Sequence, residues 1–333
     1  MAPLNPDPGA PASQLLKVYV PLLDEVSISK LAPILLVFGP TASGKTAIGT
    51  QLAANFDGEV VNADSQQLYA GLPLLTALPT EAEKGGFTHH LYGHVPPDQP
   101  WSSGKWLREV TEVIRQIRSR GKRPILVGGT GLYFEALTRG LAEIPDVEHQ
   151  ALDRVVQLEQ EQGLDAVRHK LAQIDPDAAA RILGADRQRL VRALSVYEQT
   201  GQSLTSFQKN TKPVLAKQEW RGLVIVPERE ALYNKINHRF DQMIEQGALE
   251  ELQKFCKNWE DPALPLFKAI GVRSLIKVLR DELSVEAAIT EAKRDTRRYA
   301  KRQLTWARGR TDGWQHFSDP AEILPTLQGA LNQ

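Results

Sequence analysis

The stretch with the clearest chemistry is GPTASGKT, which follows an apolar run and precedes a helix-forming segment. It fits the phosphate-loop pattern G-x-x-x-x-G-K-[ST] in full. The eight residues of this predicted loop are Gly39, Pro40, Thr41, Ala42, Ser43, Gly44, Lys45 and Thr46. The backbone amides of such a loop converge on phosphate oxygens, the lysine adds a positive charge, and the threonine hydroxyl is a ligand for Mg²⁺. The pattern indicates phosphate binding without showing which reaction follows.

A second polar group, Asp64, Ser65, Gln66 and Gln67, follows a predicted strand at 59–62. Ligands of open parallel sheets bind outside the carboxyl ends of the strands, so these side chains are expected beside the phosphate loop. A carboxylate there is suited to act as a general base, or to hold Mg²⁺ through water. The alternative is a helix N-cap, because Asp and Ser both favour that position. The neighbouring loop favours the functional interpretation.

A third strand end, in LVGGTGLYF at 126–134, offers Gly128, Gly129, Thr130 and Gly131. Glycines at a turn let the backbone approach a ligand closely, and Thr130 can form a hydrogen bond to that ligand. A tight turn needed only for packing explains the same residues equally well.

Positioning these three groups requires a parallel sheet. Strands are predicted at 34–38 and 59–62, helices at 45–55 and 106–120, and a further strand, turn and helix at 123–137. Strands that alternate with helices indicate an α/β fold with right-handed crossovers, here a P-loop NTPase-like parallel sheet flanked by helices.

The pattern then changes. Residues 143–211 have helical apolar spacing and no convincing strand, which predicts a small inserted helical domain. The chain returns to the sheet at 222–227, continues as helices at 229–256, 269–281 and 284–310, and ends in a short strand at 314–317. The predicted layout is therefore a disordered leader at 1–33 with a short element at 15–26, a core at 34–142, the insertion at 143–211, and the rest of the core at 212–333.

Composition limits the class of protein. The 333 residues are 42% hydrophobic and 24% charged with zero net charge, so any surface for nucleic acid must come from local clusters. The apolar runs are too short to span a membrane. A single cysteine, Cys256, excludes an internal disulfide and a cysteine-based zinc site, which favours the cytoplasm.

An ordered set of motifs across 34–317 resembles the tRNA dimethylallyltransferases of the bacterial type, without the zinc-finger tail of eukaryotic relatives. The motifs are GPTASGKT, NADSQQLY, LVGGTGLYF, DRQRLVRALSVYEQTG, INHRFDQMIEQG, KAIGVRSL and TRRYAKRQLTWAR. The resemblance implies transfer of a dimethylallyl group from dimethylallyl diphosphate to N6 of adenosine 37, immediately 3′ of the anticodon, in tRNAs that read codons beginning with U. Diphosphate would leave as product.

The same resemblance implies roles for individual residues. Asp64 would take the N6 proton, while Thr46, with Mg²⁺, and Arg239 in INHRFDQM would stabilise the leaving diphosphate. From the residues alone, a solvated charge on an amphipathic helix is the favoured interpretation of Arg239. The residues implied to bind the tRNA anticodon stem-loop are Asp64, Ser65, Gln66, Gln67, Thr130, Gln188, Arg189, Leu190, Val191, Arg192, Lys268 and Arg273. A monomer is expected.

Two segments supply the local positive charge that RNA requires. Residues 181–192 and 291–310 each hold about four basic residues for every acidic one, and the second also carries aromatic residues. A solvated helix face is the alternative, but phosphate contact is favoured. Residues 75–79 depart from the Gly-Thr-Ala-Lys-Pro usual in the family, Lys268 replaces a common arginine, and His149 stands where an arginine often contacts tRNA.

Three other functions remain as alternatives. An adenylate isopentenyltransferase, which prenylates a free nucleotide, would need neither the helical insertion nor the two basic segments. A P-loop kinase or ATPase would leave TRRYAKRQLTWAR unexplained. A non-catalytic tRNA-binding protein would not need the intact phosphate loop or Asp64.

Overall fold

The computed structural model describes residues 32–209 and 211–331. The predicted leader at 1–33, with its short element at 15–26, lies almost wholly outside the described residues. No helix in the described part of the chain is long and apolar enough to cross a membrane.

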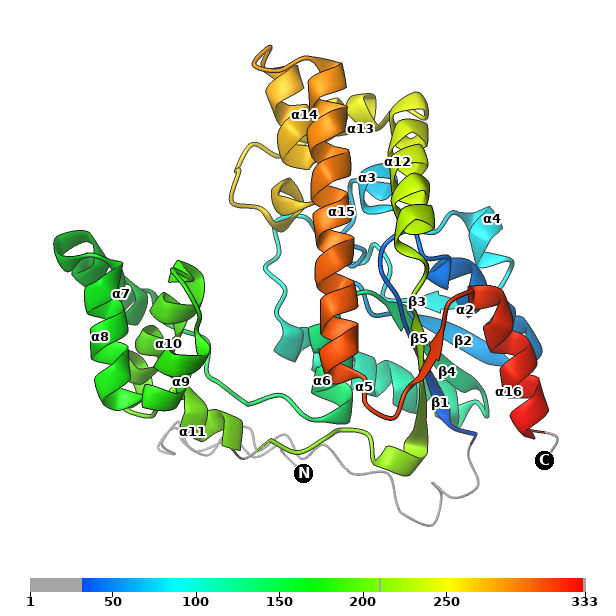
Figure 1. Cartoon of the computed structure of the whole chain (residues 1–333), viewed down its shortest axis with the longest axis horizontal. Helices are drawn as coiled ribbons and strands as arrows, with labels where there is room; N and C mark the ends of the chain where they lie inside the picture. The colour runs from blue at the N-terminus through cyan, green and yellow to red at the C-terminus, as the bar shows by residue number, and fades with distance from the viewer. Residues whose placement is uncertain (1–31, 210, 332–333) are drawn as a thin grey trace, which may run out of the picture. The chain divides into compact units, whose positions relative to one another are not determined.

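A six-stranded sheet forms the centre of the fold, with every neighbouring pair of strands parallel (Figure 1). The strands are β1 (Ile34–Phe38), β2 (Gly58–Asn62), β3 (His89–His90), β4 (Arg123–Gly128), β5 (Trp220–Ile225) and β6 (Gln315–Phe317). Their order across the sheet is β3-β2-β4-β1-β5-β6. The predicted α/β class is confirmed, and the phosphate loop follows the strand that lies between β4 and β5.

Both faces of this sheet are buried. Along β1, Ile34, Leu36 and Phe38 belong to one apolar cluster, while Leu35 and Val37 belong to another. This alternation follows from the two-residue period of a strand, and it requires helices on both faces. The first half of the chain contributes α2 (Lys45–Asn55), α3 (Pro73–Thr76), α4 (Glu81–Lys84), α5 (Ser103–Ser119) and α6 (Gly131–Thr138). The last helix is α16 (Ile323–Leu331).

Five α-helices are described between α6 and β5, and the prediction of no strand is confirmed for the residues of this segment that the structure describes (Figure 1). They are α7 (His149–Gln162), α8 (Leu164–Ile174), α9 (Pro176–Arg181), α10 (Arg187–Thr200) and α11 (Leu204–Lys209). We call them the helical insertion. They share their own apolar core, which includes Val155, Val167, Leu171, Leu190 and Leu194. The predicted domain limits at 143 and 211 stay a prediction.

The second half of the core is helical between β5 and β6. It holds α12 (Arg229–Glu245), α13 (Ala248–Asn258), α14 (Val272–Leu279) and the long α15 (Val285–Arg310). The prediction of one helix at 229–256 was wrong, because Gly247 with φ of 94° separates α12 from α13. Short 3-10 turns occur at Lys217–Glu219, Pro265–Lys268 and Pro320–Glu322. The short elements β3, α3 and α4, and the helix α16, were not predicted.

Candidate active site

The phosphate loop joins β1 to α2 at the carboxyl edge of the sheet, as its sequence predicts. Gly44 adopts a φ of 85°, in the region that favours glycine. The side chain of Lys45 is turned inward: it is 8% exposed, and its amine donates a hydrogen bond to the Pro40 carbonyl at 3.2 Å. Burial lowers the pKa of Lys45 to about 8, with the charge of Asp64 acting to raise it and that of Arg239 to lower it. Lys45 thus lies within electrostatic reach of Asp64 and Arg239, two of the three predicted catalytic residues.

Asp64 follows β2 and is held by a local turn. Its backbone amide donates to Oδ1 of Asn62 at 2.8 Å, and its own Oδ1 accepts a hydrogen bond from the amide of Gln66 at 3.0 Å. The N-cap alternative is wrong, because the next helix, α3, begins only at Pro73. The turn leaves the second carboxylate oxygen of Asp64 without a hydrogen-bond partner in the described part of the chain.

The glycines after β4 serve close packing. A Cβ on Gly128 would lie 2.0 Å from the carbonyl oxygen of Ala63, and one on Gly131 would lie 2.3 Å from the ring of Trp306. Thr130 has a positioning role instead, since its hydroxyl accepts a hydrogen bond from the amide of Ser65 at 2.9 Å. Of the two alternatives left open by the sequence, packing accounts for these two glycines, and Thr130 holds the segment that carries Asp64.

Arg239 lies on α12 and is not a solvated surface charge. Burial lowers its pKa, while Glu83 and Asp64 act to raise it, and no carboxylate of the described residues lies within 4 Å of it. The neighbouring turns of α12 are tied to α15: Arg297 donates to Asn237 at 2.6 Å, and Lys293 pairs with Asp241 at 2.6 Å. Part of the basic run on α15 therefore orients the helix that presents Arg239.

Three tyrosines were not predicted to lie near Asp64, although Tyr299 is one of the aromatic residues of the basic segment 291–310. Burial raises the pKa values of Tyr92, Tyr133 and Tyr299, and the charge of Asp64 raises each further. Tyr133 stacks on Trp106 with ring centroids 4.0 Å apart. The signal was present, since Tyr133 and Tyr299 belong to the motifs LVGGTGLYF and TRRYAKRQLTWAR. Three phenol side chains therefore lie within electrostatic reach of Asp64.

Two further polar atoms in the predicted site lack partners. Oε1 of Gln66 and Oγ of Ser43 are buried without a hydrogen bond in the described part of the chain, whereas buried polar atoms are normally bonded. Both are therefore candidates for ligand contact. Gln67 is committed elsewhere, because its side-chain amide donates to the carbonyls of Thr76 at 3.2 Å and Ala77 at 2.5 Å. It supports the segment at 75–79 that departs from the family pattern.

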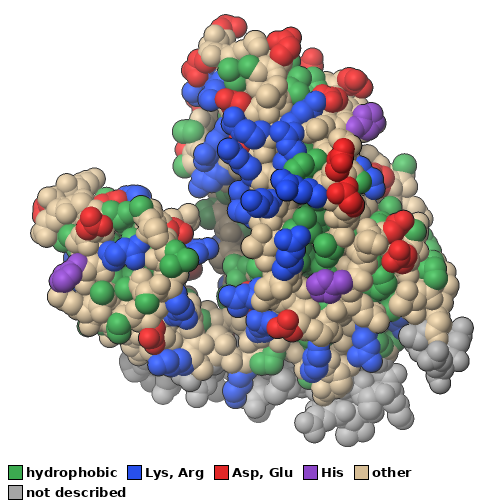
Figure 2. All heavy atoms as spheres, viewed as in Figure 1, with side chains coloured by type: hydrophobic (Ala, Val, Ile, Leu, Met, Phe, Trp, Pro, Cys, Tyr) green, Lys and Arg blue, Asp and Glu red, His purple; other side chains and the backbone are tan. Residues whose placement is uncertain are grey.

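Basic residues line the outer side of α15. Figure 2 shows Lys and Arg side chains gathered along the face over this helix. Arg298, Lys301, Arg302 and Thr305 surround a surface hollow of about 400 Å³. Lys301 and Arg302 have no carboxylate within 4 Å in the described part of the chain. This arrangement favours the phosphate-contact interpretation of segment 291–310.

The predicted RNA residues of α10 divide into two groups. Gln188, Arg189 and Arg192 are exposed, whereas Leu190 and Val191 are 0% and 5% exposed within the core of the insertion. Including Leu190 and Val191 was wrong for their side chains, because the helix turns them away from solvent. Lys268 and Arg273, before and on α14, are both exposed.

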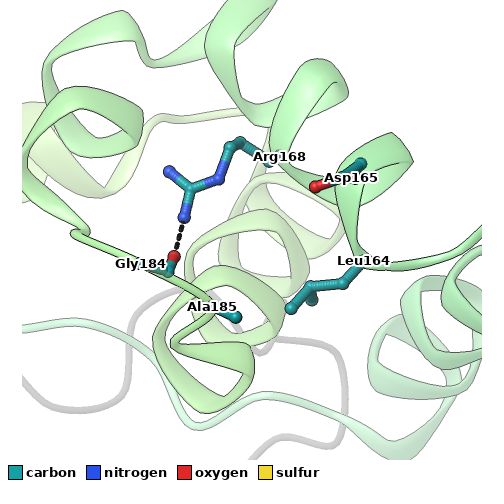
Figure 3. A pocket seen from close by; sticks show the side chains of 5 residues that line it. All are labelled: Leu164, Asp165, Arg168, Gly184 and Ala185. Carbon is teal, nitrogen blue, oxygen red and sulfur yellow. Dashed lines mark hydrogen bonds between the residues drawn. The ribbon is translucent and has the colours of Figure 1, made fainter.

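A second hollow lies within the insertion, between Leu164, Asp165, Arg168, Gly184 and Ala185 (Figure 3). Arg168 donates to the carbonyls of Ala179, Ile182 and Gly184. Its guanidinium is therefore used to hold the loop before α10, and this hollow offers no catalytic group comparable with Asp64.

The described residues contain no group of three or more His, Cys, Asp or Glu side chains placed to hold a metal ion. Mg²⁺ does not require such a group, since it is commonly bound by one or two protein oxygens together with substrate phosphates and water. The Thr46 hydroxyl at the start of α2 and the free oxygen of Asp64 fit that pattern.

Comparison with known proteins shows the family. The family model described as IPP transferase matches residues 67–310. The tRNA dimethylallyltransferase of Maricaulis maris is 47% identical over 305 residues, which cover 91% of this chain and 99% of that protein. That of Phenylobacterium zucineum is 49% identical over 285 residues, covering 86% and 92%.

Solved structures show the same relationship. The tRNA isopentenylpyrophosphate transferase of Bacillus halodurans superposes with a TM-score of 0.63 at 33% identity, covering 90% of this chain and 97% of that one. A eukaryotic dimethylallyltransferase described as acting on tRNA superposes with a TM-score of 0.72 at 29% identity, covering 82% and 69%. The predicted P-loop NTPase-like fold is confirmed, and the chain belongs to the IPP transferase family, that of the tRNA dimethylallyltransferases.

Proposed function

We propose that this protein transfers the dimethylallyl group of dimethylallyl diphosphate to N6 of adenosine 37, immediately 3′ of the anticodon, in tRNAs that read codons beginning with U. The N6 lone pair attacks C1 of the dimethylallyl group, and the C1–O bond breaks. Diphosphate leaves with that electron pair, and the displaced N6 proton passes to Asp64.

The observation that carries this proposal is that Asp64 lies close enough to Lys45 and Arg239 for its charge to act on the pKa of each. A carboxylate near one buried and one half-buried cation suits a reaction that removes a proton at one point while negative charge grows at another. The amides of the phosphate loop, Lys45 and Arg239 receive the charge of the leaving diphosphate. Asp64 lies beside them as the base.

Mg²⁺ would be held by Thr46, the diphosphate oxygens and water, with Asp64 reaching it through a water molecule. When bound, it neutralises part of the charge on the leaving group. Thr46 would then be the direct metal ligand, while Asp64 takes the N6 proton.

The tRNA anticodon stem-loop is proposed to contact Ser65, Gln66 and Thr130 near the base, with Lys268 and Arg273 on the core. Exposed Gln188, Arg189 and Arg192 supply contacts from the insertion. The adenine must leave the stacked loop to approach Asp64, as in other enzymes that modify bases.

We propose a monomer that acts in the cytoplasm, with residues 143–211 as its inserted RNA-binding domain. A single concentration-independent species of about 37 kDa would support the monomer.

The direct test is incubation with radiolabelled dimethylallyl diphosphate and Mg²⁺, with bulk tRNA or AMP as acceptor. We expect label in tRNA, at the adenosine 3′ of the anticodon, and none in AMP. Labelled AMP would assign the chain to the nucleotide-prenylating enzymes. A parallel incubation with ATP in place of dimethylallyl diphosphate tests the remaining alternative. Release of phosphate from ATP, with no dimethylallyl transfer to either acceptor, would support a P-loop kinase or ATPase instead.

A further inference from the structure

We propose that Gln303 is a positioning residue that couples RNA binding on α15 to the phosphate loop; this inference rests on the proposed function. Gln303 is 4% exposed and lies on the inner side of α15. Its Oε1 accepts a hydrogen bond from the amide of Thr41 at 3.0 Å, and its Nε2 donates to the carbonyl of Gly129 at 2.9 Å. One side chain thus joins two loops that follow neighbouring strands.

The contact is built from both sides. A Cβ on Gly129 would lie 2.1 Å from Nε2 of Gln303, so this position accepts only glycine while the glutamine stays in place. The two loops also meet directly, since the amide of Gly39 donates to the carbonyl of Gly128 at 3.2 Å. Gln303 therefore completes a three-way junction of the phosphate loop, the turn after β4 and α15.

The Thr41 bond restrains the phosphate loop without occupying its ligand face. Thr41 belongs to the first half of the loop, before the residues that lead into α2. The first amides of a helix have no partner within it, so those at the start of α2 remain for phosphate. Fixing Thr41 before the ligand arrives reduces the ordering that the ligand must otherwise impose.

The opposite side of the same helix faces solvent with basic residues. Arg298, Lys301, Arg302 and Thr305 follow the i, i+3, i+4 and i+7 spacing of one helix face, and they line the 400 Å³ hollow. RNA phosphates that bind there restrain α15, and Gln303 conveys this restraint to Thr41 and Gly129. Tyr299 on the same helix lies close to Thr130, which accepts a hydrogen bond from the amide of Ser65, and provides a parallel link toward Ser65.

The coupling is measurable on the full chain with inorganic diphosphate and Mg²⁺ as the probe. Its dissociation constant is determined by calorimetry with and without an anticodon stem-loop RNA. Coupling between sites typically changes affinity about 5–150-fold, and we expect RNA to tighten diphosphate binding by a factor within that range. Reciprocity requires diphosphate to tighten RNA binding by the same factor.

Gln303→Met keeps the side-chain length but removes both hydrogen bonds. We expect the coupling factor to fall close to one, with less than about a twofold change in RNA affinity measured alone. Gln303→Asn keeps both polar groups on a shorter side chain that cannot span the two loops, so it should lower the factor as well. It replaces Gln303→Met if that variant does not fold.

Thr290→Ala, an exposed position on the same helix, is the matched control and should keep the native factor. A native factor of one would overturn the coupling, and so would an unchanged factor in the folded Gln303 variants. If dimethylallyl transfer to tRNA persists in either case, only this inference fails. A native protein that transfers no dimethylallyl group overturns the proposed function instead, whatever the coupling factor.

Discussion

The carboxyl edge of the sheet and the helical insertion both concentrate charge, but they use it differently. At the sheet edge, Lys45 is buried and Arg239 is half-buried, and neither has a carboxylate within 4 Å in the described part of the chain. In the insertion, exposed cations pair with neighbouring acids: Arg187 with Glu159, Lys170 and Arg154 with Glu198, and Arg189 with Asp186.

The difference shows which cations remain free of carboxylate partners and can bind an anionic ligand. A buried cation without a directly bonded acid costs free energy in the folded protein, which anionic substrate can offset. Exposed ion pairs contribute little to stability and leave fewer cations for RNA. Single substitutions at the sheet edge should therefore change turnover strongly, whereas those in the insertion should change RNA affinity or stability modestly.

The largest expected effect is on the single-turnover rate, and it should distinguish Asp64 from Asp165. Asp64→Asn keeps the Oδ1 that accepts from Gln66, but it cannot take the N6 proton, so the single-turnover rate should fall by about 10²–10⁴-fold. Asp165→Asn, in the hollow of the insertion, is the matched control and should keep the native rate. The rate constants are measured across a Mg²⁺ titration. Recovery of Asp64→Asn at high Mg²⁺ would give Asp64 a metal-ordering role, and a near-native rate would remove it from the chemistry.

A smaller effect concerns pH. Because burial lowers the pKa of Lys45 to about 8, its amine loses its proton as the pH rises through that value. Diphosphate binding that depends on the ammonium should weaken above pH 8, by up to about tenfold per pH unit. Calorimetric titrations between pH 6.5 and 9.5, without RNA, measure this dependence.

Lys45→Arg is the matched variant, since a guanidinium stays charged over this range. Its affinity should show no such decline, even if it is weaker throughout. The lowered pKa of Lys45 also makes the free energy of unfolding depend on pH. Between pH 8 and the ordinary pKa of lysine, the unfolded chain binds more protons at this residue than the folded protein does, so Lys45 makes stability rise with pH. A native protein whose diphosphate affinity stays level to pH 9.5 would show that Lys45 is not required in its charged form.

Local signals in the sequence were sufficient for β1 and α2, whose predicted limits at 34–38 and 45–55 match the structure. An apolar run followed by a phosphate-loop pattern determines both elements without help from distant residues. The short helix α3 was missed because it depends on a distant carboxylate: Glu251 accepts hydrogen bonds from the amides of Leu74 and Leu75.

The site was predictable where residues follow a strand end, as Asp64 does, or where the family motif supplied a role, as for Arg239. It was not predictable where the contact joins distant segments. Gln303 lies within the motif TRRYAKRQLTWAR, but its bond to Thr41 spans 262 positions of the chain, and nothing in the local sequence shows that its side chain meets the phosphate loop. Leu190 and Val191 show the opposite error, since a motif was carried over without asking which side of α10 packs inward.

A still smaller effect concerns the exposed arginines of α10. Replacing Arg189 and Arg192 with Ala should weaken tRNA binding and flatten its salt dependence, by about 0.7–0.9 in the log–log slope for each RNA phosphate that is no longer neutralised. Binding is measured at several salt concentrations, and turnover should partly recover at high tRNA. An unaltered slope would mean that these arginines serve the insertion alone, through Asp186 and the carbonyl of Pro145.

The smallest effect tests the structural side of the comparison, at Arg181. Its guanidinium bonds to Oγ1 of Thr205 at 2.7 Å and to Oε1 of Gln208 at 3.1 Å, which ties α9 to α11. Arg181→Ala should reduce the free energy of unfolding by about 0.5–1.5 kcal/mol, the usual net value of a hydrogen bond. Its salt slope for tRNA should match that of the native protein, because the guanidinium is already bonded within the insertion. Denaturant unfolding and salt-dependent binding on the same sample measure both.

Arg181→Ala and the double variant of Arg189 and Arg192 should thus show opposite patterns, one in stability and the other in salt dependence. A flattened slope in Arg181→Ala would show that arginines already bonded within the insertion also contact RNA. The distinction between cations paired within the protein and cations left for a ligand would then not hold in the insertion.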